Sequence, residues 1–374
     1  MKKVLVIQRS LPHYRVLVYN ELRKKLANNG IELTLVYGKL KNENASKKDE
    51  VDIEWATYLE SKVFTIKNIE LYWQPCLSFI KGKDMVIVEQ ANKNLINYIL
   101  LLTRLVYKQK LAYWGHGRNM QISKNAFFNR FKSYFITICD WWFAYTQGVK
   151  EYLIAQSFPA EKITAVQNSI DTRSLSTHYD SLTNESVQNL RTELGIASAH
   201  VAIYCGGIYK EKRMEFLVES CDKIKEEIKD FHILIIGSGP DATIISEAAS
   251  SRDWIHYLGP KFELDRVKYF KLASLFMMPG LVGLAILDSF ALRTPMITTD
   301  YPYHSPEIEY LNNGVNGLIT ENTLESYVTA VVDFFQHPAK REKLAEGCQQ
   351  SSVQYTVEQM VTNLADGIIK CLNQ

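Results

Sequence analysis

The stretch VAIYCGGIYKEKRMEFLVESCDKIKEEIKDFHILIIGSG, residues 201–239, decides the fold class of this 374-residue chain. An apolar run at 201–206 ends in two glycines, an amphipathic segment follows, and a second apolar run occupies 232–237. Continuous β-branched runs separated by helical patterns are typical of parallel strands that helices cover on both faces. We therefore expect an α/β protein.

The same alternation extends outward to both ends of the chain. Further strand-like runs lie at 3–8, 31–37, 62–66, 84–89, 110–114, 143–145, 163–167, 254–259, 275–279 and 295–299. We predict two Rossmann-like parallel-sheet domains, at 1–176 and 177–355, followed by an amphipathic C-terminal helix within 356–374. The polar segment 174–184 is expected to be the hinge between them.

Composition excludes several protein classes. Hydrophobic residues make up 47% and charged residues 22%, which is ordinary globular usage rather than that of a disordered or coiled-coil chain. A net charge of +2 does not indicate a nucleic-acid binder. The cysteines are scattered without metal-site spacing, so no metal is expected. The apolar runs are too short for a signal peptide or a membrane span. These features predict a soluble, cytoplasmic protein.

One window has a distinctive charge pattern. Residues 91–139 contain no Asp or Glu, but they hold basic residues interleaved with many aromatic ones. That mixture suits an anionic membrane surface or a lipid phosphate, which favours a peripheral position on the inner membrane face. A solvated helix face with a buried aromatic side explains it equally well. Single-stranded nucleic acid fits less well, because no nucleic-acid-binding module accompanies the window.

Three glycine-containing junctions could bind phosphate. GSGPDA at 237–242 lacks the acidic residue that a dinucleotide site needs, so a tight turn explains it better. CGGIYKEKR at 205–213 places three cations at the start of a helix, where they favour a bound diphosphate over a merely solvated cluster. In MPGLVGLAILDSF, at 278–290, a small-residue loop opens a helix that carries Asp288, either a ribose ligand or an ordinary helix residue.

Taken in order, seven motifs resemble glycosyltransferase family 4, whose members are retaining enzymes of the GT-B fold. These motifs are WGHG (114–117), VQNSIDTRSL (166–175), CGGIYKEK (205–212), IIGSGPD (235–241), YLGP (257–260), PGLVGLAILDSFA (279–291) and SPEIEYLNNGVNG (305–317). The resemblance implies two domains that face a cleft, with the C-terminal helix packing back on the first. It also implies a nucleotide-sugar donor on the second domain and an acceptor on the first.

The resemblance assigns roles residue by residue. His116 matches the histidine that faces the transferred sugar, and Lys212 the lysine that neutralises the donor diphosphate. Asp288 stands where a glutamate usually binds the ribose. The other residues that we expect at the donor are Gly206, Gly207, Arg213, Gly237, Gly280, Gly283, Leu284 and Glu307. For the acceptor, the loop before the first helix offers His13, Tyr14 and Arg15.

Three departures from the family pattern stand out. Gly280 replaces the first of two glutamates spaced eight residues apart, and Gly207 replaces the arginine that partners the lysine. The N-terminal loop, QRSLPHYR at 8–15, contains no glycine. Without this arginine the site loses a bidentate contact with phosphate. We expect Arg213 or Lys210 to replace that contact.

These features predict transfer of a sugar from a nucleoside-diphosphate sugar to a glycan or lipid-phosphate-linked acceptor in cell-surface polysaccharide assembly. The leaving phosphate would take the acceptor proton, and no cofactor, metal or nucleic acid is expected. Two alternatives stay open. One is a nucleotide-sugar epimerase of the same fold, and the other is a catalytically silent scaffold.

Overall fold

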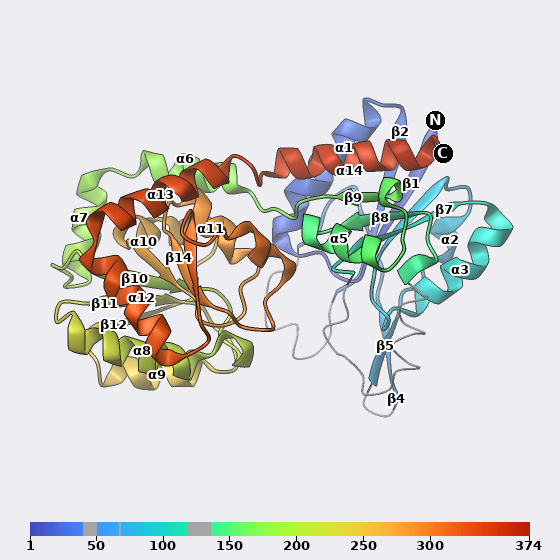
Figure 1. Ribbon diagram of the computed structural model, residues 1–374. Coiled ribbons are helices and arrows are strands. Elements are labelled where there is room, and N and C mark those ends of the chain that lie inside the picture. The colour runs from blue at the N-terminus through green and yellow to red at the C-terminus, as the bar shows by residue number, and fades with distance from the viewer. Residues whose placement is uncertain (40–50, 67–68, 118–135) are drawn as a thin grey trace. The chain divides into compact units, whose positions relative to one another are not determined.

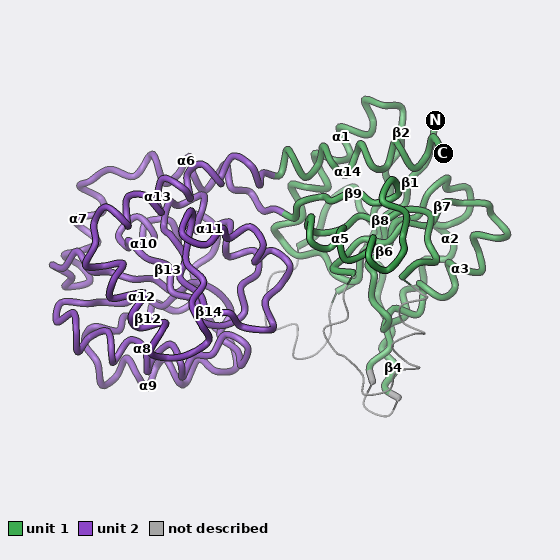
Figure 2. Tube along the Cα trace, in the orientation of Figure 1, with its two compact units in different colours: residues 1–168, 357–374 green, residues 169–356 purple. Residues whose placement is uncertain are grey.

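The computed structural model describes residues 1–39, 51–66, 69–117 and 136–374 (Figure 1). The chain divides into two compact units, and the last helix belongs to the first of them (Figure 2). Unit 1 comprises Met1–Asn168 and Val357–Gln374, and unit 2 comprises Ser169–Thr356. The predicted boundaries were 176 and 355.

Unit 1 is built on a seven-stranded parallel sheet in the order β3-β2-β1-β6-β7-β8-β9. Its strands are β1 (Lys2–Gln8), β2 (Ile31–Tyr37), β3 (Thr57–Tyr58), β6 (Met85–Glu89), β7 (Lys110–Gly115), β8 (Trp141–Ala144) and β9 (Ile163–Ala165). Its main helices are α1 (Val16–Ala27), α3 (Leu95–Tyr107), α5 (Gln147–Ala155) and α14 (Val357–Leu372). The order in which the first strands lie is that of a Rossmann sheet.

Alternate residues of the central strand face opposite sides of this sheet, as the strand period requires. Val4 and Val6 pack in one core cluster with α1 and α14, whereas Leu5 and Ile7 pack in the other with α3 and α5. Gly367 lets α14 approach the sheet, because a Cβ there would lie 2.5 Å from Thr164 Oγ1. The predicted C-terminal helix therefore does pack back on the first domain.

Unit 2 repeats the arrangement with a six-stranded parallel sheet in the order β12-β11-β10-β13-β14-β15. These strands are β10 (Val201–Cys205), β11 (His232–Ile236), β12 (Ile255–Gly259), β13 (Leu275–Met277), β14 (Met296–Thr299) and β15 (Gly317–Thr320). The helices are α6 (Thr172–Ser181), α7 (Asn184–Glu193), α8 (Met214–Glu227), α9 (Ala242–Ser250), α10 (Val267–Leu272), α11 (Ala285–Ala291), α12 (Leu324–Gln336) and α13 (Pro338–Ser352). The predicted pair of Rossmann-like parallel sheets is confirmed.

Two local expectations were wrong. The segment 174–184 is not a hinge but most of α6, which Asp171 caps by accepting a hydrogen bond from Ser174 N at 3.0 Å. Ser174, Thr177 and Ser181 lie on the exposed side of this helix, whereas Leu175 is buried. The run 62–66 forms β4 (Lys62–Ile66), which pairs antiparallel with β5 (Ile69–Trp73) in a separate hairpin rather than joining the parallel sheet.

Candidate nucleotide-sugar site

Residues from three loops of unit 2 meet at the carboxyl ends of its central strands. β10 and β13 are neighbours where the strand order reverses, and in open α/β sheets ligands bind at this switch point. The loop after β10 leads through the 3-10 turn η4 (Lys210–Lys212) into α8, and the loop after β13 leads into α11. The loop after β14 leads into η6 (Pro306–Tyr310).

Lys212 is the buried cation of this region. Its side chain is 5% exposed, and Nζ donates a hydrogen bond to the carbonyl of Leu281 at 2.5 Å. Nζ also lies 3.6 Å from the sulfur of Met278. The ammonium is therefore fixed against the loop that follows β13.

The loop that contains Gly280 is pressed against the backbone of η4. Leu281 N donates to the Glu211 carbonyl at 2.8 Å, and a Cβ at position 280 would lie 2.4 Å from that same oxygen. A glutamate, which is usual in the family at this position, would therefore clash with the backbone of η4. The close approach of the two loops explains why position 280 is a glycine. Gly207 differs, because a Cβ there would meet only the ring of Tyr209, at 2.9 Å.

Arg213, one of the two proposed substitutes for the missing arginine, is half-buried and donates several hydrogen bonds within unit 2. The backbone of Arg213 is left-handed (φ 60°). Its Nη1 donates a hydrogen bond to Asn322 Oδ1 at 2.6 Å. The same nitrogen lies 3.2 Å from the carbonyl of Pro279 and 3.3 Å from Thr299 Oγ1. Arg213 thus ties the end of β14 to the 278–284 loop. Lys210, the other substitute, lies at the start of η4.

The glycines of GSGPDA have a packing role. Gly237 and Gly239 have positive φ values of 154° and 156°, and a Cβ on either would approach a carbonyl of the β10 loop to 2.0 Å. The facing residues are Gly206 and Ile208, and Ile208 N donates to the Ser238 carbonyl at 2.9 Å. The lack of a side chain at Gly237 and Gly239 therefore lets the two loops approach each other closely.

Asp288 lies on α11 with its carboxylate already engaged. The residue is 8% exposed, and Oδ1 accepts a hydrogen bond from Arg266 Nη2 at 2.8 Å. Arg266 ends η5 (Glu263–Arg266), a segment in which sequence reasoning found no functional residue. Burial raises the pKa of the nearby Cys205 thiol to about 12, while the positive charges of Arg266 and Lys212 act in the opposite direction. Both cations therefore lie close to the end of β10.

His304 is a second residue that the motif comparison missed. Its Nδ1 accepts a hydrogen bond from Val282 N at 2.9 Å, and its Nε2 lies 2.8 Å from the carbonyl of Thr299. This pattern requires the neutral ring with its proton on Nε2. Burial lowers the pKa of His304, and the charge of Lys212 lowers it further. The signal in the sequence was a histidine directly before SPEIEY.

The remaining predicted donor residues occupy the surrounding loops. Gly283 has space around it, since the nearest neighbour of a Cβ would be Ser305 Oγ at 3.5 Å, and Leu284 is the N-cap residue of α11. Glu307 lies in η6 and is 2% exposed. Ser305 N donates to the Val282 carbonyl at 2.9 Å, which joins η6 to the 278–284 loop.

The predicted acceptor residues lie in unit 1. His116 is exposed just after β7, with its ring 4.5 Å from that of Tyr145. In the 3-10 turn η1 (His13–Arg15), His13 is exposed and Tyr14 half-buried. Arg15 is buried, and its Nη1 contacts the sulfur of Met360 on α14 at 3.7 Å. Arg15 thus connects η1 to the C-terminal helix.

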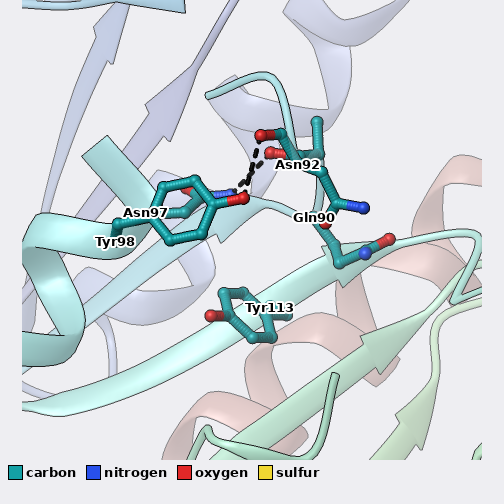
Figure 3. A pocket seen from close by; sticks show the side chains of 6 residues that line it. Gln90, Asn92, Asn97, Tyr98 and Tyr113 are labelled. Carbon is teal, nitrogen blue, oxygen red and sulfur yellow. Dashed lines mark hydrogen bonds between the residues drawn. The ribbon is translucent and has the colours of Figure 1, made fainter. Parts of the chain in front are cut away.

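A small pocket in unit 1 is lined by residues that follow β6, by residues of α3 and by one residue of β7 (Figure 3). Amide and phenol groups line it, and Tyr98 Oη donates to the Asn92 carbonyl at 3.1 Å. Gln90 N donates to the Trp114 carbonyl at 3.0 Å, which places the pocket at the sheet edge that carries His116. The lining residues are Gln90, Ala91, Asn92, Asn97, Tyr98 and Tyr113. Such uncharged donors and acceptors suit hydroxyl groups.

Much of the acid-free window lies outside the described residues. This applies to Arg118, Lys124, Arg130 and Lys132 and to the aromatic residues between 127 and 135. Within the described part, Arg104 pairs with Asp140 at 2.7 Å. Among the described residues, no helix is long and apolar enough to cross a membrane, and no cluster of side chains has the composition of a metal site.

Part of the chain is similar in sequence to known glycosyltransferases. The family "Glycosyl transferases group 1" matches residues 199–337. The alpha-monoglucosyldiacylglycerol synthase of Acholeplasma laidlawii is 27% identical over 48% of this chain and 46% of its own length. The alpha-D-kanosaminyltransferase of Streptomyces kanamyceticus is 26% identical over 42% of each chain. The matched stretch thus spans less than half the length of these relatives.

Among solved structures, HepE of Anabaena in complex with UDP has a TM-score of 0.71 at 13% identity, over 99% of this chain and 100% of that one. At this identity the similarity concerns the fold, and it extends over both units. Residues 199–337 are therefore similar to group 1 glycosyltransferases, and the two-domain chain has the GT-B fold.

Proposed function

We propose that this protein is a retaining glycosyltransferase that moves a sugar from a nucleoside-diphosphate sugar to a glycan or lipid-linked acceptor. The observation that carries the proposal is the cluster at the end of β10, where the Lys212 ammonium is fixed against the 278–284 loop. A buried, preorganised cation stabilises the charge that develops on a departing diphosphate. The relatives that share the domain are named for sugar transfer, which supports the same reaction.

A nucleotide panel tests the donor site. Thermal unfolding is measured with UDP, GDP, ADP and CMP and their common sugar conjugates, and UDP is the first choice because HepE binds it. A ligand at 100 times its dissociation constant stabilises the native state by about 2.7 kcal/mol. We expect one nucleotide to act and Lys212→Ala to abolish the effect. Lys223→Ala, which removes an exposed lysine from α8 of the same unit, serves as the control.

Product analysis separates the rival functions. A transferase yields a free nucleoside diphosphate and a glycoside that keeps the anomeric configuration of the donor, which NMR coupling constants report. An epimerase changes the sugar while the nucleotide stays attached, and needs no acceptor. A silent scaffold binds no nucleotide, so the absence of a thermal shift with every ligand of the panel contradicts the proposal.

The acceptor is proposed to reside at a membrane surface. Four apolar side chains at the end of α3 are largely exposed, namely Leu102 (68%), Leu105 (76%), Val106 (74%) and Tyr107 (47%). Lys108 follows them directly, and the 91–139 window holds eight basic residues and no acidic ones. Apolar side chains beside cations are the composition of an interfacial helix on anionic lipid.

Vesicle sedimentation tests this surface. We expect binding to phosphatidylglycerol vesicles at low salt, weaker binding at high salt, and little binding to pure phosphatidylcholine. The double variant Leu105→Asp/Val106→Asp should lose the binding while the nucleotide-dependent thermal shift persists. Failure to bind anionic vesicles even at low salt excludes the membrane surface but leaves the transferase proposal standing.

A further inference from the structure

The ion pair between Arg266 and Asp288 is the least expected feature of unit 2. Both side chains are largely shielded from solvent, with 17% and 11% exposed, and Nη2 lies 2.8 Å from Oδ1. Arg266 Nη1 also donates to the Glu263 carbonyl at 3.0 Å. Its Nε is buried without a hydrogen-bond partner among the described residues. Among these residues, Asp288 is thus the only side chain to which the guanidinium donates a hydrogen bond.

The two oxygens of Asp288 differ in their surroundings. Oδ1 accepts from Arg266, whereas Oδ2 makes no hydrogen bond within the described part of the chain. Oδ2 is not fully buried and belongs to the small exposed part of this side chain. A single bond to a rigid guanidinium fixes one oxygen and leaves the other directed outward.

The position of this pair on the sheet matters. α11, which carries Asp288, follows β13, and η5, which carries Arg266, follows β12. α11 begins directly after the 278–284 loop, and the Lys212 ammonium is fixed against that loop. The pair therefore lies at the switch point of the sheet, beside the cation to which the donor diphosphate was assigned.

We propose that Arg266 is a positioning residue that orients the Asp288 carboxylate so that Oδ2 accepts a hydrogen bond from the ribose of the donor. The inference rests on the proposed donor site. Aspartate is one methylene shorter than the glutamate usual in the family, so its carboxylate needs an external group to hold it in place. Arg266 supplies that group from a neighbouring loop. The pair therefore sets the preference for ribonucleotide over deoxyribonucleotide donors.

Affinity for UDP and for 2′-deoxy-UDP and 3′-deoxy-UDP, measured by calorimetry on the full chain, tests the inference. If the nucleotide panel selects a base other than uracil, the diphosphate of that nucleoside and its 2′-deoxy and 3′-deoxy analogues replace the three uridine ligands. The wild type should prefer UDP to at least one deoxy analogue by about tenfold or more, the effect of a hydrogen bond to a charged group. Asp288→Asn and Arg266→Gln should each reduce this preference to about threefold or less. The first variant removes the charge of the carboxylate, and the second removes the guanidinium that orients it.

The double variant and a conservative variant sharpen the test. Because the two residues act as one unit, Arg266→Gln/Asp288→Asn should lose no more preference than either single variant. Arg266→Gln leaves a buried charge without its partner, which destabilises the fold. Arg266→Lys avoids this problem because lysine keeps the positive charge. It should fold and show an intermediate preference, because an ammonium lacks the fixed geometry of the guanidinium.

Arg252→Gln is the matched control. Arg252 forms an ion pair with Asp222 in the same unit through two hydrogen bonds, at 2.6 and 2.9 Å. Its loss should leave the ribose preference unchanged. A folded Arg266 variant that keeps the wild-type preference overturns the inference, and so does one that weakens all three ligands equally. If the wild type binds no nucleoside diphosphate at all, the proposed function itself fails before Arg266 is altered.

Discussion

The imidazole of His304 holds the 278–284 loop in place by accepting the backbone hydrogen bond of Val282 at 2.9 Å. Its other nitrogen donates to the carbonyl of Thr299 at the end of β14. The conformation of the loop that we propose to face the donor phosphate therefore depends on a side chain from a different loop. This dependence makes the site sensitive to the protonation of one histidine.

We first predict that donor binding weakens at acid pH. Burial lowers the folded-state pKa of His304 below its ordinary value of 6.5, so the neutral ring is present at neutral pH and is lost as pH falls through the folded pKa. A protonated Nδ1 would face the Val282 N–H with a second donor. Nucleotide affinity measured from pH 8 to pH 5 should fall in the wild type. In His304→Leu it should be weak throughout and depend less on pH, whereas exposed His337→Leu should behave as the wild type.

The second prediction concerns the two glycines of the 278–284 loop. Gly280→Ala should destabilise the protein by about 1–3 kcal/mol, the typical cost of overpacking, because the new methyl group meets backbone atoms of η4. Gly283→Ala should change stability by less than about 1 kcal/mol, since its surroundings are open. Urea unfolding compares the two variants. Equal stability of both would show that the close contact at Gly280 is not maintained in solution.

Removing the buried cation should affect turnover more than folding. We expect Lys212→Ala to reduce kcat/KM for the donor by about 10²–10³-fold, the usual loss when one preorganised stabilising group is removed. Initial-rate measurements at saturating acceptor give this value, with a circular dichroism spectrum to verify the fold. A reduction of less than tenfold would exclude Lys212 as the main stabiliser of the leaving diphosphate.

Chelation should leave sugar transfer unchanged. The Lys212 ammonium and the loop amides are expected to stabilise the leaving diphosphate without a divalent ion. Transfer is assayed after dialysis against EDTA, and again after addition of Mg²⁺ or Mn²⁺. Loss of activity on dialysis with full recovery on adding a metal contradicts this part of the mechanism.

The last prediction lies away from the site. His232 and His256 stack with Nδ1 and Nε2 3.1 Å apart on adjacent strands β11 and β12. Burial, and then the neighbouring His232, lowers the pKa of His256 to about 4. Because the folded pKa is below the ordinary value of 6.5, stability should be lost as pH falls from about 6.5 toward 4. Denaturant midpoints across this range should change less in His256→Leu than in the wild type.

The alternation of apolar runs and amphipathic segments was sufficient to predict both parallel sheets. The buried parallel strand β10 is apolar at every position, and β11 is apolar after its first residue, so each run is visible without knowledge of its neighbours. Ordered motifs likewise indicated Lys212 and Asp288. The hinge prediction at 174–184 failed because a helix with one buried leucine has the composition of a linker.

Contacts between distant segments were decided only by the tertiary structure. Arg266 and Asp288 are 22 residues apart and meet because β12 and β13 end at the same edge of one sheet. Gly280 appeared to be a lost glutamate until the backbone of η4 was seen to fill the space. Local sequence patterns indicate which residues prefer burial or a given backbone conformation. Hydrogen-bond partners and the space available to a side chain depend instead on how loops that are distant in the sequence pack together.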